Sequence, residues 1–570
     1  MTKTGKKWIL ALSLLLVPAA LVGQGLDPAS ILKHATDSWP TYSGDYTSDR
    51  FSTLAQINSS NVKNLGLAWV THLPAGAGNG AGADGFAAFF AAGGTPTIVG
   101  GEAAEAVPVG GAGAGPRLSG AVLQVNGILY LSAPDNAYAV DAHDGTVLWH
   151  YFWKTKGGTH IGNRGMAMYH DWLFFETPDD YLVSLDAKTG KERWHKVISD
   201  FGQQYFSTMA PVVIGNHLIV GTGDDLDAPG YMESVDPESG DVQWTWYSEP
   251  EKMGDAGSDS WPNLDAMRHG GAGVWVPGAY DPELHLYYFG TANPTPAFSA
   301  ATREGNDLYT SCLVAVNVDT GKLAWYFQSS PEDTHDWDAA QTPVLVDGTF
   351  DGKPRKMLLN ATRNGYFFVL DRVTGEHLLT SPVVPTLNWS SGLNKRGEPV
   401  RNPEKDASPG GALVSPNSDG VVNWQPPSYD PQTGLFYLPT SEPFSVFYRT
   451  EPNPRAMQGL NGIQEQQVGD LGRAIEAIDY KTGKVAWRHE LPSSGEGGGG
   501  ETGMLTTAGH LLFSGDADGN FVAWDPANGK PLWHTHLGQV SSAAETYTLE
   551  GKQYVLVLSG DAIYAFSLGD

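Results

Sequence analysis

The sequence predicts an all-β fold, an eight-bladed β-propeller, on three observations. A short phrase recurs along the chain, its most closely spaced copies stand 45 to 50 residues apart, and alternating apolar and polar stretches separate the copies. That period is the length of one four-stranded propeller blade, whereas a β-solenoid would need a much shorter one. Eight copies therefore predict eight blades, which we expect to form a single domain over residues 26–570.

The recurring phrase explains how each blade is built. An apolar strand ends in polar turn residues, Gly allows the backbone to adopt φ > 0, and the next strand is expected to carry a Trp inward. A seventh copy has Leu379 at the Trp position, and "NLGLAW", ending in Trp69, matches the end of an eighth. We expect this eighth copy to share a blade with the last strands near residue 565 and so to close the ring. The six complete Gly/Trp pairs are Gly145/Trp149, Gly190/Trp194, Gly240/Trp244, Gly321/Trp325, Gly483/Trp487 and Gly529/Trp533.

Several segments fall outside this repeat. The wide gaps 240–321 and 375–483 must each hold one blade and long loops. The Gly/Ala-rich insertion 75–117 is typical of a flexible loop, which is either an idle surface insertion or a lid. Residues 1–25 combine a positively charged start with an apolar run and small residues, the pattern of a secretory signal peptide. We therefore expect an exported, periplasmic protein with no membrane span after cleavage; an uncleaved anchor is the alternative.

Charge and cysteine content exclude several classes of protein. The formal net charge is −28, which argues against binding to nucleic acid or to anionic lipid. The chain has one cysteine, Cys312, so it has no intrachain disulfide, no Cys-x-x-Cys-His haem attachment, no iron–sulfur cluster and no cysteine zinc site.

Several loops contain polar and aromatic residues that are suited to a ligand site. A protein that served only as a scaffold would not need these residues. Carboxylate and amide oxygens suit Ca²⁺, arginines suit the carboxylates of a ligand, and a Trp among glycines can lie flat under a ring system. Taken singly, each is more often a structural turn residue. In "THDWDAAQTP", for example, His335, Asp336 and Asp338 are all possible acids or bases. The other candidates are Asn163, Arg164, Thr208, Thr222, Asp224, Asp225, Trp275, Asn293, Arg363, Asn364, Asn423 and Trp424.

From residue 39 to the C-terminus, the chain resembles the quinoprotein alcohol dehydrogenases, eight-bladed propellers that bind pyrroloquinoline quinone (PQQ) and calcium. The resemblance begins at "WPTYSGDYTSDRFSTLAQINSSNVKNLGLAW", and the repeat is similar to that family's tryptophan-docking motif. The most specific stretch is "GTANPTPAFSAATREGNDLYTSCLVAVNVDTGKLAWYFQSSPEDTHDWD", residues 290–338, where an Asn-Pro loop, a blade motif and a Trp-Asp pair follow in order.

The resemblance implies a role for each matching residue. Asp338 is implied as the catalytic base beside the metal, and Arg363 as the group next to the quinone oxygens. Asn293 and Asp225 are implied as calcium ligands, with Asp224 as the alternative to Asp225. The implied PQQ-binding residues are Trp275 beneath the ring, Arg164, Thr208 and Thr222 at its periphery, and Asn423, together with Trp424 as a weaker match.

The chain also departs from the family pattern. Gly158–Thr159 stand where many members have two adjacent cysteines, and a family Glu and Trp are replaced near Ser119 and near Glu501. Lanthanide-using members carry a second Asp two positions after the base, where this chain has Ala340. Because a divalent ion needs fewer carboxylates than a trivalent one, Ca²⁺ is expected.

The implied reaction is oxidation of an alcohol to an aldehyde or ketone. Asp338 would take the hydroxyl proton, Ca²⁺ and Arg363 would polarise the quinone, and PQQ would accept the hydride. Electrons would then pass to a separate acceptor such as cytochrome c. Two alternatives stay open: a non-catalytic periplasmic propeller scaffold, and a sugar or polyol dehydrogenase of the same fold.

Overall fold

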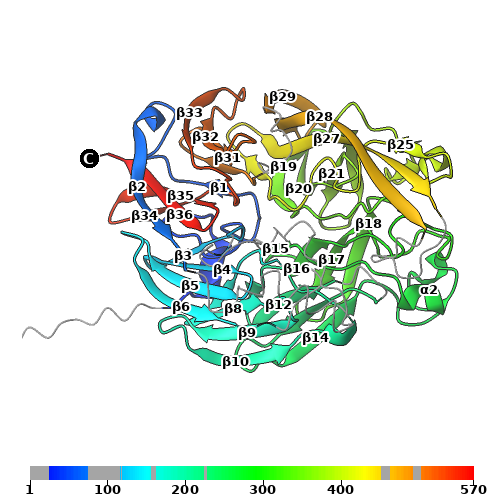
Figure 1. The fold of residues 1–570 in the computed structure, drawn as a ribbon, viewed down its shortest axis with the longest axis horizontal. Helices are drawn as coiled ribbons and strands as arrows, with labels where there is room; N and C mark the ends of the chain where they lie inside the picture. The colour runs from blue at the N-terminus through cyan, green and yellow to red at the C-terminus, as the bar shows by residue number, and fades with distance from the viewer. Residues whose placement is uncertain are drawn as a thin grey trace, which may run out of the picture.

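The structure, a computed structural model, is a ring of eight β-sheets around a central axis, which is called the channel below (Figure 1). It describes residues 25–74, 116, 118–153, 155, 162–203, 205–223, 228–450, 462–491 and 502–569. The all-β, eight-bladed prediction is therefore confirmed. The predicted signal peptide up to residue 24 and nearly all of the 75–117 insertion lie outside these ranges.

The first five blades follow one another along the chain, each built from its innermost to its outermost strand. Blade one comprises β3 (Leu123–Val125), β4 (Ile128–Ala133), β5 (Asn136–Asp141) and β6 (Val147–Phe152). Blade two comprises β7 (Ala167–Tyr169), β8 (Trp172–Glu176), β9 (Tyr181–Asp186) and β10 (Glu192–Val197). Blade three comprises β11 (Val212–Ile214), β12 (His217–Thr222), β13 (Tyr231–Val235) and β14 (Val242–Tyr247). Blade four comprises β15 (Ala279–Asp281), β16 (Leu286–Gly290), β17 (Cys312–Asn317) and β18 (Leu323–Gln328). Blade five comprises β19 (Val344–Phe350), β20 (Lys353–Ala361), β21 (Tyr366–Asp371) and β22 (His377–Pro382).

Blades six and seven each contain one extra strand, and blade eight takes its outermost strand from the start of the chain. Blade six comprises β25 (Ala412–Val414), β26 (Ser428–Asp430), β27 (Leu435–Arg449), β28 (Ile463–Asp479) and β29 (Lys484–Leu491). Blade seven comprises β1 (Phe51–Ser52), β30 (Leu505–Thr507), β31 (Leu511–Gly515), β32 (Asn520–Trp524) and β33 (Pro531–His536). Blade eight comprises β34 (Glu545–Leu549), β35 (Lys552–Ser559), β36 (Ala562–Leu568) and β2 (Leu65–His72). Strand β2 pairs antiparallel with β36, with Trp69 opposite Ala565, so the predicted closure of the ring is confirmed.

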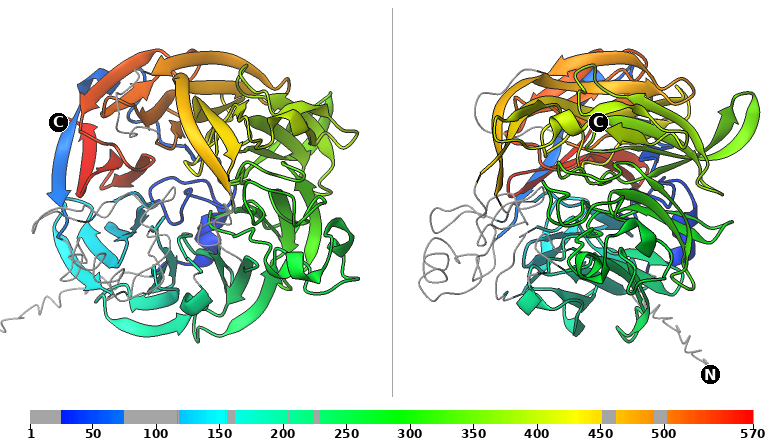
Figure 2. Two further views of the ribbon diagram at one scale, coloured as in Figure 1. Left: turned by 45° about the vertical axis from the view of Figure 1, so that its right-hand side comes forward. Right: turned by 90° about the vertical axis from the view of Figure 1, so that its right-hand side faces the viewer.

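The two wide gaps in the repeat contain short helices and a hairpin in addition to blade strands. The first contains η4 (Ser258–Ser260) and α2 (Leu264–Arg268), and the second contains the hairpin β23 (Ser390–Leu393)–β24 (Pro399–Arg401) and η5 (Pro403–Lys405). The long β27–β28 ribbon, yellow to orange in Figure 2, extends away from its blade. The other short helices are η1 (Pro28–Leu32), η2 (Val62–Asn64) and η3 (Phe201–Gln203). Among the described residues, no helix is long and apolar enough to cross a membrane.

The repeated Gly and Trp join neighbouring blades. Trp149 lies on the outermost strand β6, and its Nε1 donates to the carbonyl oxygen of Ala187 in the next blade at 2.9 Å. Gly190, at φ +66°, packs against the same indole, and a Cβ there would lie 2.7 Å from the ring. Trp244 repeats the arrangement with the carbonyl of Val318. The Trp side chains therefore pack against the core between neighbouring blades, a contact with the next blade's turn that the repeat alone does not specify.

One segment, residues 39–52, lines the channel and is called the channel segment below. Its backbone or side chains hydrogen-bond to the innermost strands or adjoining loops of seven blades. The partners are Gln124, Val213, Tyr280, Leu345, Tyr429, Thr506 and Ala544. Because most of these contacts fall on the innermost strands themselves, the channel segment lies deeper in the channel than the loops that precede those strands.

Candidate active site

The predicted site residues that the structure describes come from two kinds of position at one end of the channel. Some lie in loops that lead into the innermost strand of a blade, and the others lie at or just after the end of its second strand. The first group is Arg164, Thr208, Trp275, Asp338 and Asn423. The second group is Thr222, Asn293 and Arg363. The innermost and second strands of a blade are antiparallel, so the start of one and the end of the other lie at the same rim of the ring. Residues from distant blades can therefore meet there.

Asp338 contacts more of the predicted site residues than its neighbours in the same loop do. Its side chain is buried, and its Oδ2 accepts a hydrogen bond from Trp275 Nε1 at 2.9 Å. Its Oδ1 accepts one from the backbone N–H of Asn293 at 2.6 Å. A guanidinium nitrogen of Arg363 lies 3.2 Å from Oδ2. Hydrogen bonds to a carboxylate are short and strong, so these three groups fix the carboxylate in one orientation.

Two buried arginines flank the ring of Trp275. The guanidinium carbon of Arg164 lies 4.3 Å from the ring centroid, and that of Arg363 lies 5.4 Å away. Arg164 also lies 5.2 Å from the ring of Trp424 and donates to Thr208 Oγ1 at 2.5 Å. Guanidinium groups bind carboxylates in a planar fork and stack on aromatic faces. A flat apolar surface between two such cations fits a planar ligand that carries several negative charges.

The surroundings of Trp275 also fit a bound ring system. Trp275 and Trp424 belong to one buried apolar cluster that includes Phe206 and Ala340. Among the described residues, the buried Thr222 Oγ1 has the hydroxyl of Tyr231 as its polar neighbour, and that hydroxyl donates its proton to the carbonyl of Ile198. A buried hydroxyl without a partner is costly, so a polar atom of a ligand would relieve it.

The structure separates Asp338 from the two other candidates in its loop. His335 is buried, stacks on Trp337 with ring centroids 4.4 Å apart, and has its pKa lowered to about 4 by burial. Asp336 contacts the outer side of Arg363, with 3.5 Å between the charged atoms. Only Asp338 is bonded to both Trp275 and Asn293. His335 therefore serves the packing of the loop, and Asp336 orients Arg363.

Three predicted amides mainly hold their own loops. Asn163 bridges Ser132 and the Glu176 carbonyl, and Asn364 receives the N–H of Tyr366. Asn423 accepts from the N–H of Trp424 at 2.7 Å and donates to the Asp419 carbonyl. Asn423 thereby positions Trp424, whose ring lies against Arg164.

Some predicted positions lie outside the described residues. These are Asp224, Asp225, Gly158–Thr159 and Glu501. Ser119 is described and buried. The predicted metal ligands that can be placed are therefore Asn293 and Asp338.

Sequence reasoning missed two buried groups near Arg164. Glu176 is buried at the end of β8, and burial raises the pKa of its carboxyl well above its usual range. Tyr42, from the channel segment, is also buried, and its hydroxyl has no hydrogen-bond partner among the described residues. The local sequences "FFETPDD" and "WPTYSG" do not indicate that Glu176 and Tyr42 lie near Arg164. These residues come together only when different blades and the channel segment meet.

Comparison with known proteins identifies the family of the chain. The family model described as "Glucose/ethanol/alcohol dehydrogenase, beta-propeller domain" matches residues 39–386, and a model described as "Outer membrane protein assembly factor BamB" matches residues 472–570. The chain is 34% identical to the quinohemoprotein alcohol dehydrogenase of Comamonas testosteroni, over 95% of the chain and 75% of the relative. It is 32% identical to the "1-butanol dehydrogenase (cytochrome c)" of Thauera butanivorans, over 92% of the chain and 75% of the relative.

Solved structures show the same relationship. The crystal structure of the Comamonas testosteroni enzyme superposes with a TM-score of 0.81 at 29% identity, covering 95% of this chain and 82% of that one. A europium-containing methanol dehydrogenase superposes with a TM-score of 0.78 at 27% identity, covering 93% of this chain and 98% of that one. The chain therefore belongs to the PQQ-dependent, or quinoprotein, alcohol dehydrogenase family.

Proposed function

We propose that this protein oxidises an alcohol to an aldehyde or ketone at the Asp338–Trp275–Arg363 site, with PQQ and Ca²⁺ bound there. The observation that carries the proposal is the orientation of the Asp338 carboxylate by Trp275, Asn293 and Arg363. A general base must be held within hydrogen-bond reach of the proton that it takes. A structural carboxylate could be satisfied anywhere in the fold, whereas this one adjoins a flat surface between two cations.

The residues present fit PQQ, a planar quinone with three carboxylates. The ring of Trp275 would lie beneath it, and Arg164, Thr208 and Thr222 would hold its periphery. Trp424, positioned by Asn423, packs against Arg164 and keeps that cation in place. When bound, PQQ supplies the two-electron acceptor that the side chains of the protein lack.

Two side chains of this chain take part directly in the proposed reaction. Asp338 accepts the hydroxyl proton of the alcohol as general base. Arg363 stabilises negative charge that develops on oxygen beside it. Arg363 is itself held in place, since it donates to the backbone carbonyl of Asp336 at 3.1 Å. It therefore needs little rearrangement during the reaction.

Calcium would be held on the Asn293 side of Asp338. The side-chain Nδ2 of Asn293 donates to the Pro294 carbonyl at 3.0 Å, which leaves its Oδ1 as the ligand atom. Asp225 is proposed as the carboxylate ligand from sequence alone, with Asp338 adjacent. Ala340, two positions after Asp338, contributes no further carboxylate, so Ca²⁺ is favoured over a trivalent ion.

The electron acceptor is proposed to be a separate protein such as cytochrome c. The name of the Thauera butanivorans relative includes that acceptor. The net charge of −28 suits a basic partner, because opposite net charges steer association. The leader-like residues 1–25 favour a periplasmic location for this exchange.

Reconstitution tests the proposal. The purified protein is incubated with PQQ and Ca²⁺, and dye reduction is measured across primary alcohols, secondary alcohols and polyols. We expect PQQ binding and alcohol-dependent reduction with Ca²⁺, and less with La³⁺. A protein that binds no PQQ and reduces no dye would instead support the scaffold alternative. Polyols oxidised in strong preference to simple alcohols would support the sugar or polyol alternative.

A further inference from the structure

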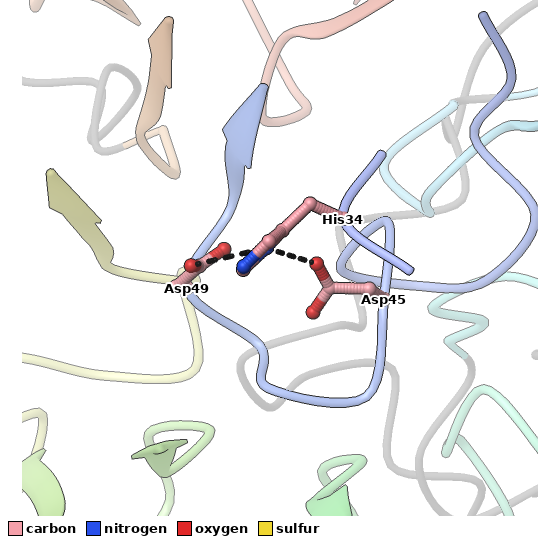
Figure 3. Close-up of side chains that lie close together, drawn as sticks. All are labelled: His34, Asp45 and Asp49. Carbon is pink, nitrogen blue, oxygen red and sulfur yellow. Dashed lines mark hydrogen bonds and ion pairs between the residues drawn. The ribbon is translucent and has the colours of Figure 1, made fainter. Parts of the chain in front are cut away.

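A pair of buried carboxylates lies in the channel segment, away from the proposed active site. Asp45 and Asp49 both point toward the imidazole of His34 (Figure 3). The His34 Nδ1 lies 2.9 Å from Asp45 Oδ2 and 3.7 Å from Asp49 Oδ2. The His34 side chain is 51% exposed, whereas those of Asp45 and Asp49 are 4% and 7% exposed, so the three groups form a site that is open on one side.

The turn that carries the two aspartates directs one oxygen of each toward His34. Asp45 Oδ1 accepts from both the N–H and the hydroxyl of Thr47, and Asp49 Oδ1 accepts from the N–H of Phe51 at 2.9 Å. Each carboxylate is therefore fixed through Oδ1, and each Oδ2 faces the histidine. The arrangement is set by the local backbone and does not depend on His34.

The Asp49 carboxylate faces His34 across a longer gap than the Asp45 carboxylate does. The hydroxyl of Thr47 lies beside the Asp49 carboxylate, but its 2.6 Å hydrogen bond goes to Asp45 Oδ1. Arg50, the next residue in the chain, points elsewhere and donates to the carbonyls of Met504, Tyr42 and Ala544. The 3.7 Å ion pair between His34 Nδ1 and Asp49 Oδ2 is longer than a hydrogen bond. A buried carboxylate is stabilised when a cation approaches it closely, and a metal ion between the three side chains would lie nearer to Asp49 Oδ2 than the imidazole does.

We propose that His34 Nδ1, Asp45 Oδ2 and Asp49 Oδ2 form a binding site for a divalent transition-metal ion such as Zn²⁺. The three ligand atoms all lie within 4.8 Å of one another. Tetrahedral Zn²⁺ with bonds of about 2.0–2.1 Å places its ligand atoms roughly 3.3 Å apart, between the two distances measured to His34. One imidazole and two carboxylates suit Zn²⁺, and a water molecule would complete the coordination on the exposed side of His34.

The site would give the fold a structural clamp. His34 precedes the channel segment, and Asp45 and Asp49 lie within it. The metal would tie the residues after the short helix η1 to the segment that contacts seven blades. This role is independent of PQQ and of the proposed reaction.

The experiment compares Zn²⁺ binding in the wild-type protein and in His34→Gln, with Ca²⁺ in excess throughout. Zn²⁺ affinity is measured by competition with a chromophoric chelator, and the melting temperature is recorded with and without Zn²⁺. We expect His34→Gln to bind one Zn²⁺ fewer with high affinity, and the melting temperature to rise with Zn²⁺ in the wild type alone. Loss of a direct ligand should weaken this site at least about tenfold, since loss of an outer partner already weakens metal sites by that amount.

A matched control uses His143, whose exposure and 2.9 Å contact with a single carboxylate resemble those of His34. Its partner Asp141 is exposed, and no second carboxylate reaches the same nitrogen. His143→Gln should leave Zn²⁺ binding unchanged. Asp49→Asn should lose the Zn²⁺ site although the contact between His34 and Asp45 remains. In a separate test, Co²⁺ should show its tetrahedral absorption bands only in proteins that keep all three ligands. Equal Zn²⁺ uptake by wild type and His34→Gln would overturn the proposal, and so would no uptake by the wild type at pH 7.5.

Discussion

Two buried arginines, Arg363 in the proposed active site and Arg50 in the channel segment, each lie near an indole ring but differ in their main polar partners. Their side chains are 2% and 1% exposed. Arg50 donates to three backbone carbonyls, with distances of 2.7–2.9 Å. Arg363 instead contacts the Asp338 carboxylate and faces the ring of Trp275.

The difference shows how one channel serves two purposes. In the channel segment, Arg50 is matched to backbone carbonyls of the segment itself and of the surrounding blades, so its side chain is part of the scaffold. In the proposed active site, side chains from different blades are matched to one another around an apolar ring. The first arrangement stabilises the fold, and the second presents charge to a ligand. Substitutions in the two regions should accordingly affect different measurements.

The largest effect is expected from Asp338→Asn. The variant keeps the shape of the side chain but cannot act as a base, so kcat should fall by about 10² to 10⁴. PQQ binding, followed by its absorbance, should change little. Asp336→Asn is the matched control, because Asp336 contacts Arg363 without reaching Trp275 or Asn293. A fully active Asp338→Asn protein would contradict the assignment of the base.

The next effect is expected from Arg50→Met. The change leaves three buried carbonyls and the nearby carboxyl of Glu545 without their cation. Removing one partner of a buried charged network costs about 3–5 kcal/mol, which denaturant unfolding would measure. Arg355→Met should cost less than Arg50→Met, because Arg355 is 28% exposed and one of its two carboxylate partners, Glu376, stays hydrated. Similar losses in the two variants would mean that the Arg50 side chain is not part of the scaffold.

His335 should make stability sensitive to acid. Burial lowers its pKa from 6.5 to about 4, so the unfolded chain binds the proton first as the pH falls. The contribution of His335 is complete above pH 6.5 and is lost as the pH falls through about 4, a change of about 3 kcal/mol. The difference in unfolding free energy between wild type and His335→Gln, measured from pH 7 to pH 4, should show this trend. A difference that does not vary with pH would contradict it, and the exposed His72→Gln serves as control.

The smallest effect is expected from Trp275→Phe. The ring face for PQQ remains, but the 2.9 Å hydrogen bond from Nε1 to Asp338 is lost. A hydrogen bond to a charged group contributes about 1.5–3 kcal/mol, so we expect kcat to fall roughly tenfold or more, with a smaller change in PQQ affinity. Trp424→Phe keeps the bond to Asp338 and should affect PQQ affinity more than kcat. The reverse pattern would mean that Trp275 does not orient the base.

The repeat in the sequence predicted the fold. It did not predict which residues the Trp side chains contact. Glycines followed by Trp at a fixed spacing predicted eight blades and closure through Trp69, because each blade repeats the same local pattern. The pattern could not show that Trp149 docks on Gly190 of the next blade, since that contact joins separate repeats. Similarly, the candidates in "THDWDAAQTP" could be ranked by family resemblance, but only the fold brings Trp275 and Asn293 to Asp338.

The sequence by itself determined the blade number, the closure of the ring and the family to which the loops of the site correspond. These properties follow from local turn chemistry and from a period that repeats along the chain. The tertiary structure alone decided that Glu176 and Tyr42 lie near Arg164, that Arg50 is bonded to backbone, and that His34 meets Asp45 and Asp49. Such contacts depend on where the channel segment and separate blades meet, and no spacing in the sequence encodes that meeting.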